Sequence, residues 1–209
     1  MTDAHGAPRE GVEIAATADV DERATIRSGT RVWHLAQVRE GASVGRNCII
    51  GRGAYVGPGV HLGDNVKLQN YALVYEPAEL ADGVFVGPAA VLTNDEYPRA
   101  VTPQGRVKSG DDWTAVGVVV GEGAAIGARA VCVAPVSIGR WALIAAGAVV
   151  TRDVPDFGLM VGVPARRVGW VGRTGQPLIA KDDGRWSCPH TGAEYREDGG
   201  RLTELTPAG

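Results

Sequence analysis

The chain has 209 residues, a formal net charge of -3, 44% hydrophobic residues and 30 glycines. This length suits one domain with an ordinary core. The small net charge gives no reason to expect nucleic acid or an anionic membrane as a partner, and the apolar content excludes a largely disordered chain.

The N-terminal segment MTDAHGAPREG contains no apolar run, so residues 1–11 are expected to form a flexible leader. No apolar stretch elsewhere approaches the roughly 18 residues that a membrane-spanning helix needs. The three cysteines, Cys48, Cys132 and Cys188, are far apart and form no CxxC pair. Neither a zinc knuckle nor a disulfide framework is therefore expected. These features indicate a reducing, cytoplasmic setting.

A repeat of six residues begins at Ile14. Every sixth residue from Ile14 to Leu92 is Ile, Val or Leu, which gives fourteen consecutive aliphatic positions. Small side chains recur two residues earlier, and glycine often follows. A helix would need spacings of three and four, and an ordinary strand alternates every two residues. The period of six instead predicts a β-solenoid of short strands and turns, with the aliphatic side chains pointing inward. Cys48 and Cys132 fall within this pattern, so core packing is their expected role.

The repeat stops after Leu92 and resumes at Val120, 28 residues later. Because 28 is four more than a multiple of six, the polar loop between them shifts the register of the repeat. The two runs hold twenty hexapeptides, enough for between six and seven triangular coils. Pro155 and Pro164 should end the coils, because proline cannot donate to a strand ladder. The expected sections are a first β-helix section (12–93), an extended active-site loop (94–117), a second β-helix section (118–154), and a C-terminal cap and tail (155–209).

Two stretches near the end of the repeats, AAGAVVTRDVP (145–155) and VGVPARRVGW (161–170), resemble the hexapeptide acyltransferases. Most of the chain resembles nucleotide-sugar 3-N-acetyltransferases. Three stretches carry this resemblance: RVWHLAQV (31–38), residues 65–99 and CPHTGAEY (188–195). That family acts on UDP-2-acetamido-3-amino-2,3-dideoxyglucuronate in the synthesis of bacterial surface polysaccharides. The resemblance implies an all-β, left-handed parallel β-helix, homotrimers with active sites between subunits, acetyl-CoA as co-substrate, and no metal.

Adjacent arginines beside a proline turn suit a phosphate-bearing ligand such as CoA, although exposed arginines are often simply solvated. The expected cofactor-binding residues are Ala146, Gly147, Arg152, Pro164, Arg166 and Arg167.

The loop carries no histidine, since none occurs between His61 and His190. An O-acetyltransferase must deprotonate a hydroxyl, whereas a neutral amine is already a good nucleophile. The missing histidine therefore favours N-acetylation. The expected mechanism is direct attack of the amine on acetyl-CoA in a ternary complex, with backbone N–H groups stabilising the oxyanion.

Asn94 stands where the resemblance places the residue that positions the acceptor amine, and it is the expected catalytic residue; its alternative role is to form a turn. The loop cations could pair with a uronate carboxylate or a diphosphate, or only with the loop's own acids. The expected substrate-binding residues are His34, Gln69, Asn70, Tyr75, Glu76, Tyr97, Arg99, Arg106 and Lys108.

The sequence DEYPR (95–99) differs from the Y-x-N-P-R that family members tend to carry, so the resemblance specifies the reaction more closely than the sugar. One alternative is an N-acetyltransferase for another dTDP- or UDP-linked 3- or 4-amino deoxysugar. A second is a non-catalytic β-helix that serves as a binding module. A third is a γ-type carbonic anhydrase, which is disfavoured because three zinc-binding histidines are needed and His34 and His61 occupy different places in their hexapeptides.

Overall fold

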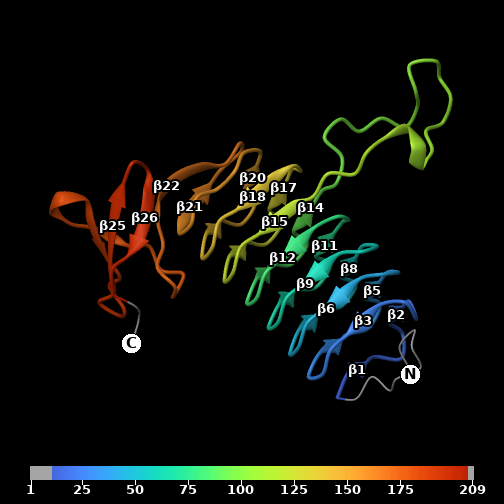
Figure 1. Ribbon diagram of the computed structural model, residues 1–209, viewed down its shortest axis with the longest axis horizontal. Helices are drawn as coiled ribbons and strands as arrows, with labels where there is room; N and C mark the ends of the chain where they lie inside the picture. The colour runs from blue at the N-terminus through green and yellow to red at the C-terminus, as the bar shows by residue number, and fades with distance from the viewer. Residues whose placement is uncertain (1–10, 207–209) are drawn as a thin grey trace.

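The computed structural model describes residues 11–206 and shows a parallel β-helix followed by a small antiparallel sheet (Figure 1). The β-helix has three faces. The first face holds β1 (Glu13–Ile14), β4 (Arg31–Val32), β7 (Ile49–Ile50), β10 (Lys67–Leu68), β13 (Phe85–Val86), β16 (Ala125–Ile126), β19 (Leu143–Ile144) and β21 (Gly158–Val161). The second face holds β2 (Asp19–Val20), β5 (Gln37–Val38), β8 (Tyr55–Val56), β11 (Leu73–Val74), β14 (Val91–Leu92), β17 (Val131–Cys132) and β20 (Val149–Val150). The third face holds β3 (Thr25–Ile26), β6 (Ser43–Val44), β9 (His61–Leu62), β12 (Glu79–Leu80), β15 (Val118–Val120) and β18 (Val136–Ile138).

Neighbouring strands on a face are parallel and, within one run of repeats, eighteen residues apart, so three hexapeptides make one coil. Leu68, for example, pairs with Ile50 on one side and Val86 on the other. Across the loop, Leu80 pairs with Val120, which keeps the aliphatic positions aligned despite the insertion. The predicted fold class, an all-β parallel β-helix, is confirmed.

The core is the column of aliphatic side chains that point into the coils. Ile50, Leu68 and Ile126 are fully buried, and so are Cys48 and Cys132, as expected for core residues. The buried hydroxyl of Thr30 donates to the Gly45 carbonyl at 2.8 Å and accepts from the Cys48 N–H at 2.9 Å. The stack is therefore apolar at its centre, and this polar group is satisfied within it.

Parallel stacking continues beyond Pro155, which corrects the predicted end of the coils. β21 pairs in parallel with β19, with Leu159 opposite Leu143, so the first face gains a rung that the hexapeptide count missed. Pro155 is tolerated because it lies at a corner, where its carbonyl accepts the Gly158 N–H at 3.1 Å and no ladder donor is needed. The β-helix ends only when β22 (Arg166–Trp170) folds back antiparallel on β21.

The C-terminal segment is a folded cap, at the left of Figure 1. It contains β23 (Ile179–Ala180), β24 (Arg185–Ser187), β25 (Glu194–Asp198) and β26 (Arg201–Glu204), which form an antiparallel sheet. A second apolar cluster lies beneath it and includes Phe157, Trp170, Leu178 and Tyr195. The Glu197 carboxylate accepts hydrogen bonds from the indole N–H groups of Trp170 at 2.9 Å and Trp186 at 3.1 Å. This carboxylate thereby joins β22 to the cap.

Two ends of the chain lie outside the described residues, 1–10 and 207–209, and most of the predicted leader falls there. Within residues 11–206 the helical segments are two 3-10 turns, Gly110–Asp112 and Asp182–Gly184. Neither comes near the length or the apolar character of a membrane-spanning helix.

The glycines that follow the aliphatic positions allow the coils to approach closely, and Gly87 gives a direct test. A Cβ at Gly87 would lie 2.6 Å from the Ala128 nitrogen and 2.7 Å from the Gly127 carbonyl carbon, both rigid backbone atoms of the next coil. We expect Gly87→Ala to destabilise the protein by about 1–3 kcal/mol, the usual range for overpacking. Urea denaturation measures this, with Gly110→Ala as control because no atom lies within 4 Å of its Cβ position. An unchanged unfolding midpoint for Gly87→Ala would contradict the close approach.

Candidate functional site

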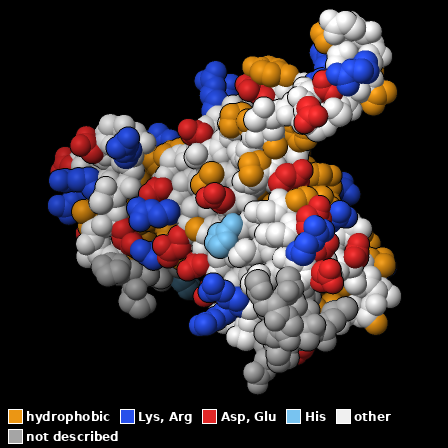
Figure 2. All heavy atoms as spheres, turned by 45° about the vertical axis from the view of Figure 1, so that its right-hand side comes forward, with side chains coloured by type: hydrophobic (Ala, Val, Ile, Leu, Met, Phe, Trp, Pro, Cys, Tyr) orange, Lys and Arg blue, Asp and Glu red, His pale blue; other side chains and the backbone are white. Residues whose placement is uncertain are grey.

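The interruption of the repeat is a projecting loop, residues 93–117, which stands off the body between β14 and β15 (Figures 1 and 2). Its root is fastened to the coils. The Thr93 hydroxyl accepts the Ala134 N–H at 2.9 Å, and the Val116 N–H donates to the Asn94 carbonyl at 3.0 Å. Asn94 therefore lies where the loop both leaves and rejoins the β-helix.

The loop carries charges of both signs (Figure 2) and satisfies some of them internally. Arg106 donates to the Asp112 carboxylate at 2.9 Å, and the Ser109 N–H donates to it at 2.7 Å. The hydrogen bond from Arg106, followed by those from Ser109, lowers the pKa of Asp112 to about 2. For Arg106 the structure thus shows the internal ion pair that the sequence left open as an alternative.

Arg99 and Lys108 line a shallow depression of about 340 Å³ on the loop, together with Asp95, Ser109 and Trp113. Arg99 donates to the Pro98 carbonyl at 2.8 Å, and neither cation forms an ion pair within the described part of the chain. Tyr97 is 76% exposed, and a side-chain hydrogen bond with Glu96 raises its pKa above the ordinary value. Arg99 and Lys108 are thus the loop cations left available to an anionic ligand.

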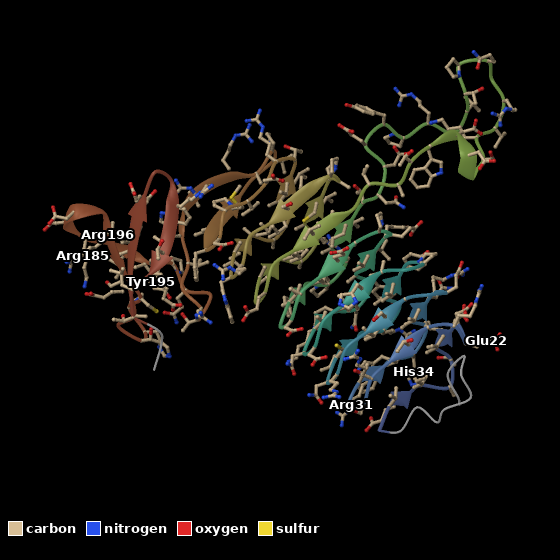
Figure 3. All side chains as sticks on the ribbon, in the orientation of Figure 1. Glu22, Arg31, His34, Arg185, Tyr195 and Arg196 are labelled. Atoms are coloured by element: carbon tan, nitrogen blue, oxygen red, sulfur yellow. The ribbon has the colours of Figure 1, made fainter. Side chains whose placement is uncertain are left out.

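The first corner, made of the turns that join the first face to the second, contains three of the expected substrate residues. His34, Gln69 and Asn70 line a depression of about 300 Å³ there. His34, labelled in Figure 3, lies in the N-terminal coils, with its Nδ1 2.9 Å from the Thr17 hydroxyl. The Asn70 side-chain oxygen accepts the Arg52 N–H at 3.0 Å, which fixes the orientation of its amide. The depression is open to solvent and lined by both polar and apolar groups of neighbouring coils.

Sequence reasoning missed three residues of this corner: Trp33, Arg52 and Tyr71. Trp33 and Arg52 line the depression, and the Arg52 guanidinium donates to the Tyr71 hydroxyl at 3.3 Å. The signal that could have found Arg52 is the coil length. Residues 34, 52 and 70 are spaced by eighteen and therefore occupy equivalent places on successive coils, as the register confirms.

The second corner, made of the turns that join the second face to the third, holds Tyr75 and Glu76 below the loop root. The Tyr75 ring lies 5.1 Å from the ring of Tyr55, centroid to centroid. Asn94 follows β14 one coil further along, in register with this corner. The expected substrate residues are thus divided between two edges, with the second face between them.

Four of the six expected cofactor residues gather at the C-terminal end of the first corner. Ala146 and Gly147 form the turn between β19 and β20, and the Gly147 N–H donates to the Ala128 carbonyl at 2.9 Å. The turn that contains Pro164 is bound to β20, because the Ala165 N–H donates to the Val149 carbonyl at 2.7 Å. Arg166, which begins β22 beside this turn, is exposed.

The other two expected cofactor residues are placed differently. Arg152 leads into the second corner, after β20. Arg167 stacks 4.0 Å over the Trp170 ring and pairs with Glu197 at 3.4 Å, so its guanidinium belongs to the contact with the cap. Arg166, rather than Arg167, is thus the arginine of this turn that is available to a ligand.

The first corner also sets the distance between the expected substrate residues near Asn70 and the expected cofactor residues near Ala146. Hydrogen bonds step along it from Asn70 to Ala89 and from Ala128 to Gly147, one coil at a time. Three steps of roughly 4.8 Å separate Asn70 from Ala146, or about 14 Å. This edge can hold a long, extended ligand. Within residues 11–206 no three His, Cys, Asp or Glu side chains lie close enough to hold a metal ion.

Comparison with known proteins identifies the repeats. The family described as "Bacterial transferase hexapeptide (six repeats)" matches residues 23–58, and "Hexapeptide repeat of succinyl-transferase" matches residues 117–152. The bifunctional protein GlmU of Alkalilimnicola ehrlichii is 36% identical over 168 residues, which cover 76% of this chain and 36% of the relative.

A shorter and stronger match is the dTDP-3-amino-3,6-dideoxy-alpha-D-galactopyranose 3-N-acetyltransferase of Aneurinibacillus thermoaerophilus. It is 53% identical over 53 residues, or 25% of this chain and 28% of the relative. The crystal structure of LpxA, a UDP-N-acetylglucosamine acyltransferase from Bacteroides fragilis, has the same fold, with a TM-score of 0.60 and 17% identity over 77% of this chain and 61% of that chain. The matched part of the chain spans about a third of the length of these curated relatives.

Proposed function

We propose that this chain, whose repeats match those of the hexapeptide transferases over residues 23–58 and 117–152, transfers an acetyl group from acetyl-CoA to the amino group of a nucleotide-linked aminosugar. The observation that carries the proposal is the loop root, where Asn94 stands over the coils and the loop brings no histidine. An amine suits such a site, because its neutral form is a good nucleophile without strong general-base catalysis. The relative that is 53% identical over 53 residues is named a 3-N-acetyltransferase of a dTDP-aminosugar, which supports an amino acceptor.

The acceptor we assign is a UDP-2-acetamido-3-amino uronate used in bacterial surface polysaccharide synthesis. Its carboxylate and diphosphate are anions, and Arg99 and Lys108 are the loop cations without an ion pair in the described chain. Acetyl-CoA would lie along the first corner toward Ala146 and Gly147, with Arg166 toward a phosphate. Asn94 would hold the amine against the thioester, and backbone N–H groups of neighbouring coils would stabilise the oxyanion.

We further propose that three chains assemble with their axes parallel and the second face at the contact. The outward residues of five successive strands on this face are apolar: Tyr55, Leu73, Val91, Val131 and Val149. The third face instead presents mostly polar residues such as Ser43, His61 and Glu79. Contact through the second face would bring the first corner of one chain toward the loop of its neighbour, so that each site is completed by two chains.

A panel of nucleotide aminosugars tests the proposal. Purified protein is mixed with acetyl-CoA and UDP- or dTDP-linked 3-amino and 4-amino sugars, with and without a C5 carboxylate, and thiol release is followed. The uronate is expected to give the highest kcat/KM. Faster release with a dTDP-linked 3-amino deoxysugar would move the assignment to that sugar. If no acceptor released thiol above the acceptor-free control, the N-acetyltransferase function would be refuted.

A further inference from the structure

Glu76 lies on the second corner directly beneath the loop root. Val74 pairs with Leu92, and the Tyr75 N–H donates to the Leu92 carbonyl at 3.3 Å, so the chain after Val74 runs below the chain that becomes the loop. The returning end of the loop is also close, because a Cβ at Gly117 would lie 2.7 Å from the Pro77 carbonyl oxygen. Both ends of the loop therefore cover the turn that carries Glu76.

The Glu76 carboxylate is unusual in its lack of partners. Its Oε2 is the only buried side-chain oxygen or nitrogen in residues 11–206 without a hydrogen bond. Acidic groups at the corner between the third and first faces behave differently. There Asp64 accepts the Arg46 N–H and Asp82 accepts the Asp64 N–H, each at 2.7 Å. A buried carboxylate oxygen without a donor is costly, so its retention points to a ligand that supplies the donor.

The surrounding residues of the described chain make room for this carboxylate but place no free cation beside it. Gly57, on the preceding coil, lies so close that a Cβ there would be 2.5 Å from Oε2. Tyr55 is near enough that, after its own burial, the charge of Glu76 raises the pKa of the phenol. The nearest cation along this corner, Arg39, is already paired with Glu40 at 3.0 Å. Glu76 as a whole remains partly exposed, so a small cationic group can reach it.

We propose that Glu76 receives the ammonium group of the aminosugar and takes its proton, which makes Glu76 a second catalytic residue beside Asn94. This inference rests on the proposed function. An alkyl ammonium has donors that match the unpartnered carboxylate and a charge that neutralises it. It must lose a proton before it can attack, and the loop carries no histidine to take that proton. Asn94 stands about one coil away, roughly 4.8 Å along the axis, on the side where acetyl transfer is proposed.

The step balances without any further reactant. One N–H bond of the ammonium breaks and its proton bonds to the Glu76 carboxylate. The freed electron pair forms a bond from nitrogen to the thioester carbonyl carbon. The carbon–sulfur bond then breaks with its electron pair on sulfur, and a second proton from the nitrogen passes to the thiolate. The products are the N-acetyl sugar and CoA thiol, and Glu76 returns its proton to solvent.

The test compares Glu76→Gln with the wild type over about pH 6 to 9, by thiol release with the best aminosugar of the panel. Near neutral pH the glutamine variant is expected to lose about 10²-fold or more in kcat/KM, the usual worth of a positioned proton acceptor. The deficit should shrink as pH rises, because solution then supplies the neutral amine. The variant should melt at or above the wild-type temperature, since glutamine keeps the size of the side chain and removes the charge from a group whose Oε2 is buried without a hydrogen bond. Glu79→Gln, an exposed carboxylate three residues away, is the matched control and should behave as wild type.

Three outcomes would overturn the inference. An unchanged kcat/KM for Glu76→Gln at every pH would remove Glu76 from the reaction. A deficit of constant size across the pH range, carried by KM, would make it a binding group only. A wild-type protein that acetylates no aminosugar would refute the proposed function and this inference together, whereas the first two outcomes leave the proposed function standing.

Discussion

Replacing Asn94 with alanine is expected to lower kcat for aminosugar acetylation by about 10²-fold or more, the scale on which one positioned polar group acts on a transition state. The reason is the place of Asn94 at the loop root. Its backbone carbonyl fastens the returning strand through Val116, which alanine preserves, whereas its amide is lost. The melting temperature should therefore stay within the small range of surface substitutions. Steady-state kinetics and a thermal melt on the same preparation measure both effects.

Gln104→Ala is the matched control, because it removes an exposed amide from the same loop far from its root. It should leave kcat at the wild-type value. Full activity of Asn94→Ala with unchanged stability would mean that Asn94 only forms the turn, which is the other role its sequence position allows. Loss of activity together with a large fall in melting temperature would also count against a direct role.

Most of the β-helix can be predicted from the sequence because the burial of its side chains is periodic along the chain. A six-residue spacing of aliphatic side chains fits neither a helix nor an alternating strand, but it fits a β-solenoid. Ile50 and Leu68 are buried where that spacing places them. The same arithmetic, taken at eighteen residues, places His34 and Asn70 on one corner together with Arg52, which was overlooked. Periodicity does not reveal β21, because its glycine and methionine do not continue the aliphatic pattern.

The remainder of the site depends on contacts between segments that have no common period. The sequence offers the loop's own acids as partners for its cations but does not single out Asp112 for Arg106, and nothing local in it indicates that Arg167 pairs with Glu197. The contacts of the cap are also between separate segments, since Glu197 accepts hydrogen bonds from two tryptophans, Trp170 and Trp186, that lie in different strands. Such pairings follow from the folded geometry, so a list of candidate residues from sequence alone contains groups that are already engaged.

The Val131→Arg substitution is expected to separate the proposed trimer into single chains and to abolish most of its acetyl transfer. Val131 lies on the second face, within the five successive apolar outward positions, and is only partly exposed even in one chain. A long, strongly hydrated cation in the middle of an apolar contact leaves an unpaired charge without water, which interfaces do not tolerate. The side chain points away from the coils, so the β-helix itself should keep its melting behaviour apart from the loss of assembly.

Analytical ultracentrifugation and thiol release, measured at the same protein concentration, test this prediction. Val119→Arg is the matched control: it is also an outward valine on a central strand, but it lies on the third face and is 47% exposed. It should retain both assembly and activity. A Val131→Arg protein that stays assembled would place the contact on another face. Single chains with full kcat/KM would show instead that each chain carries a complete site. A site that needs the loop of a neighbouring chain would lose its activity when the chains separate.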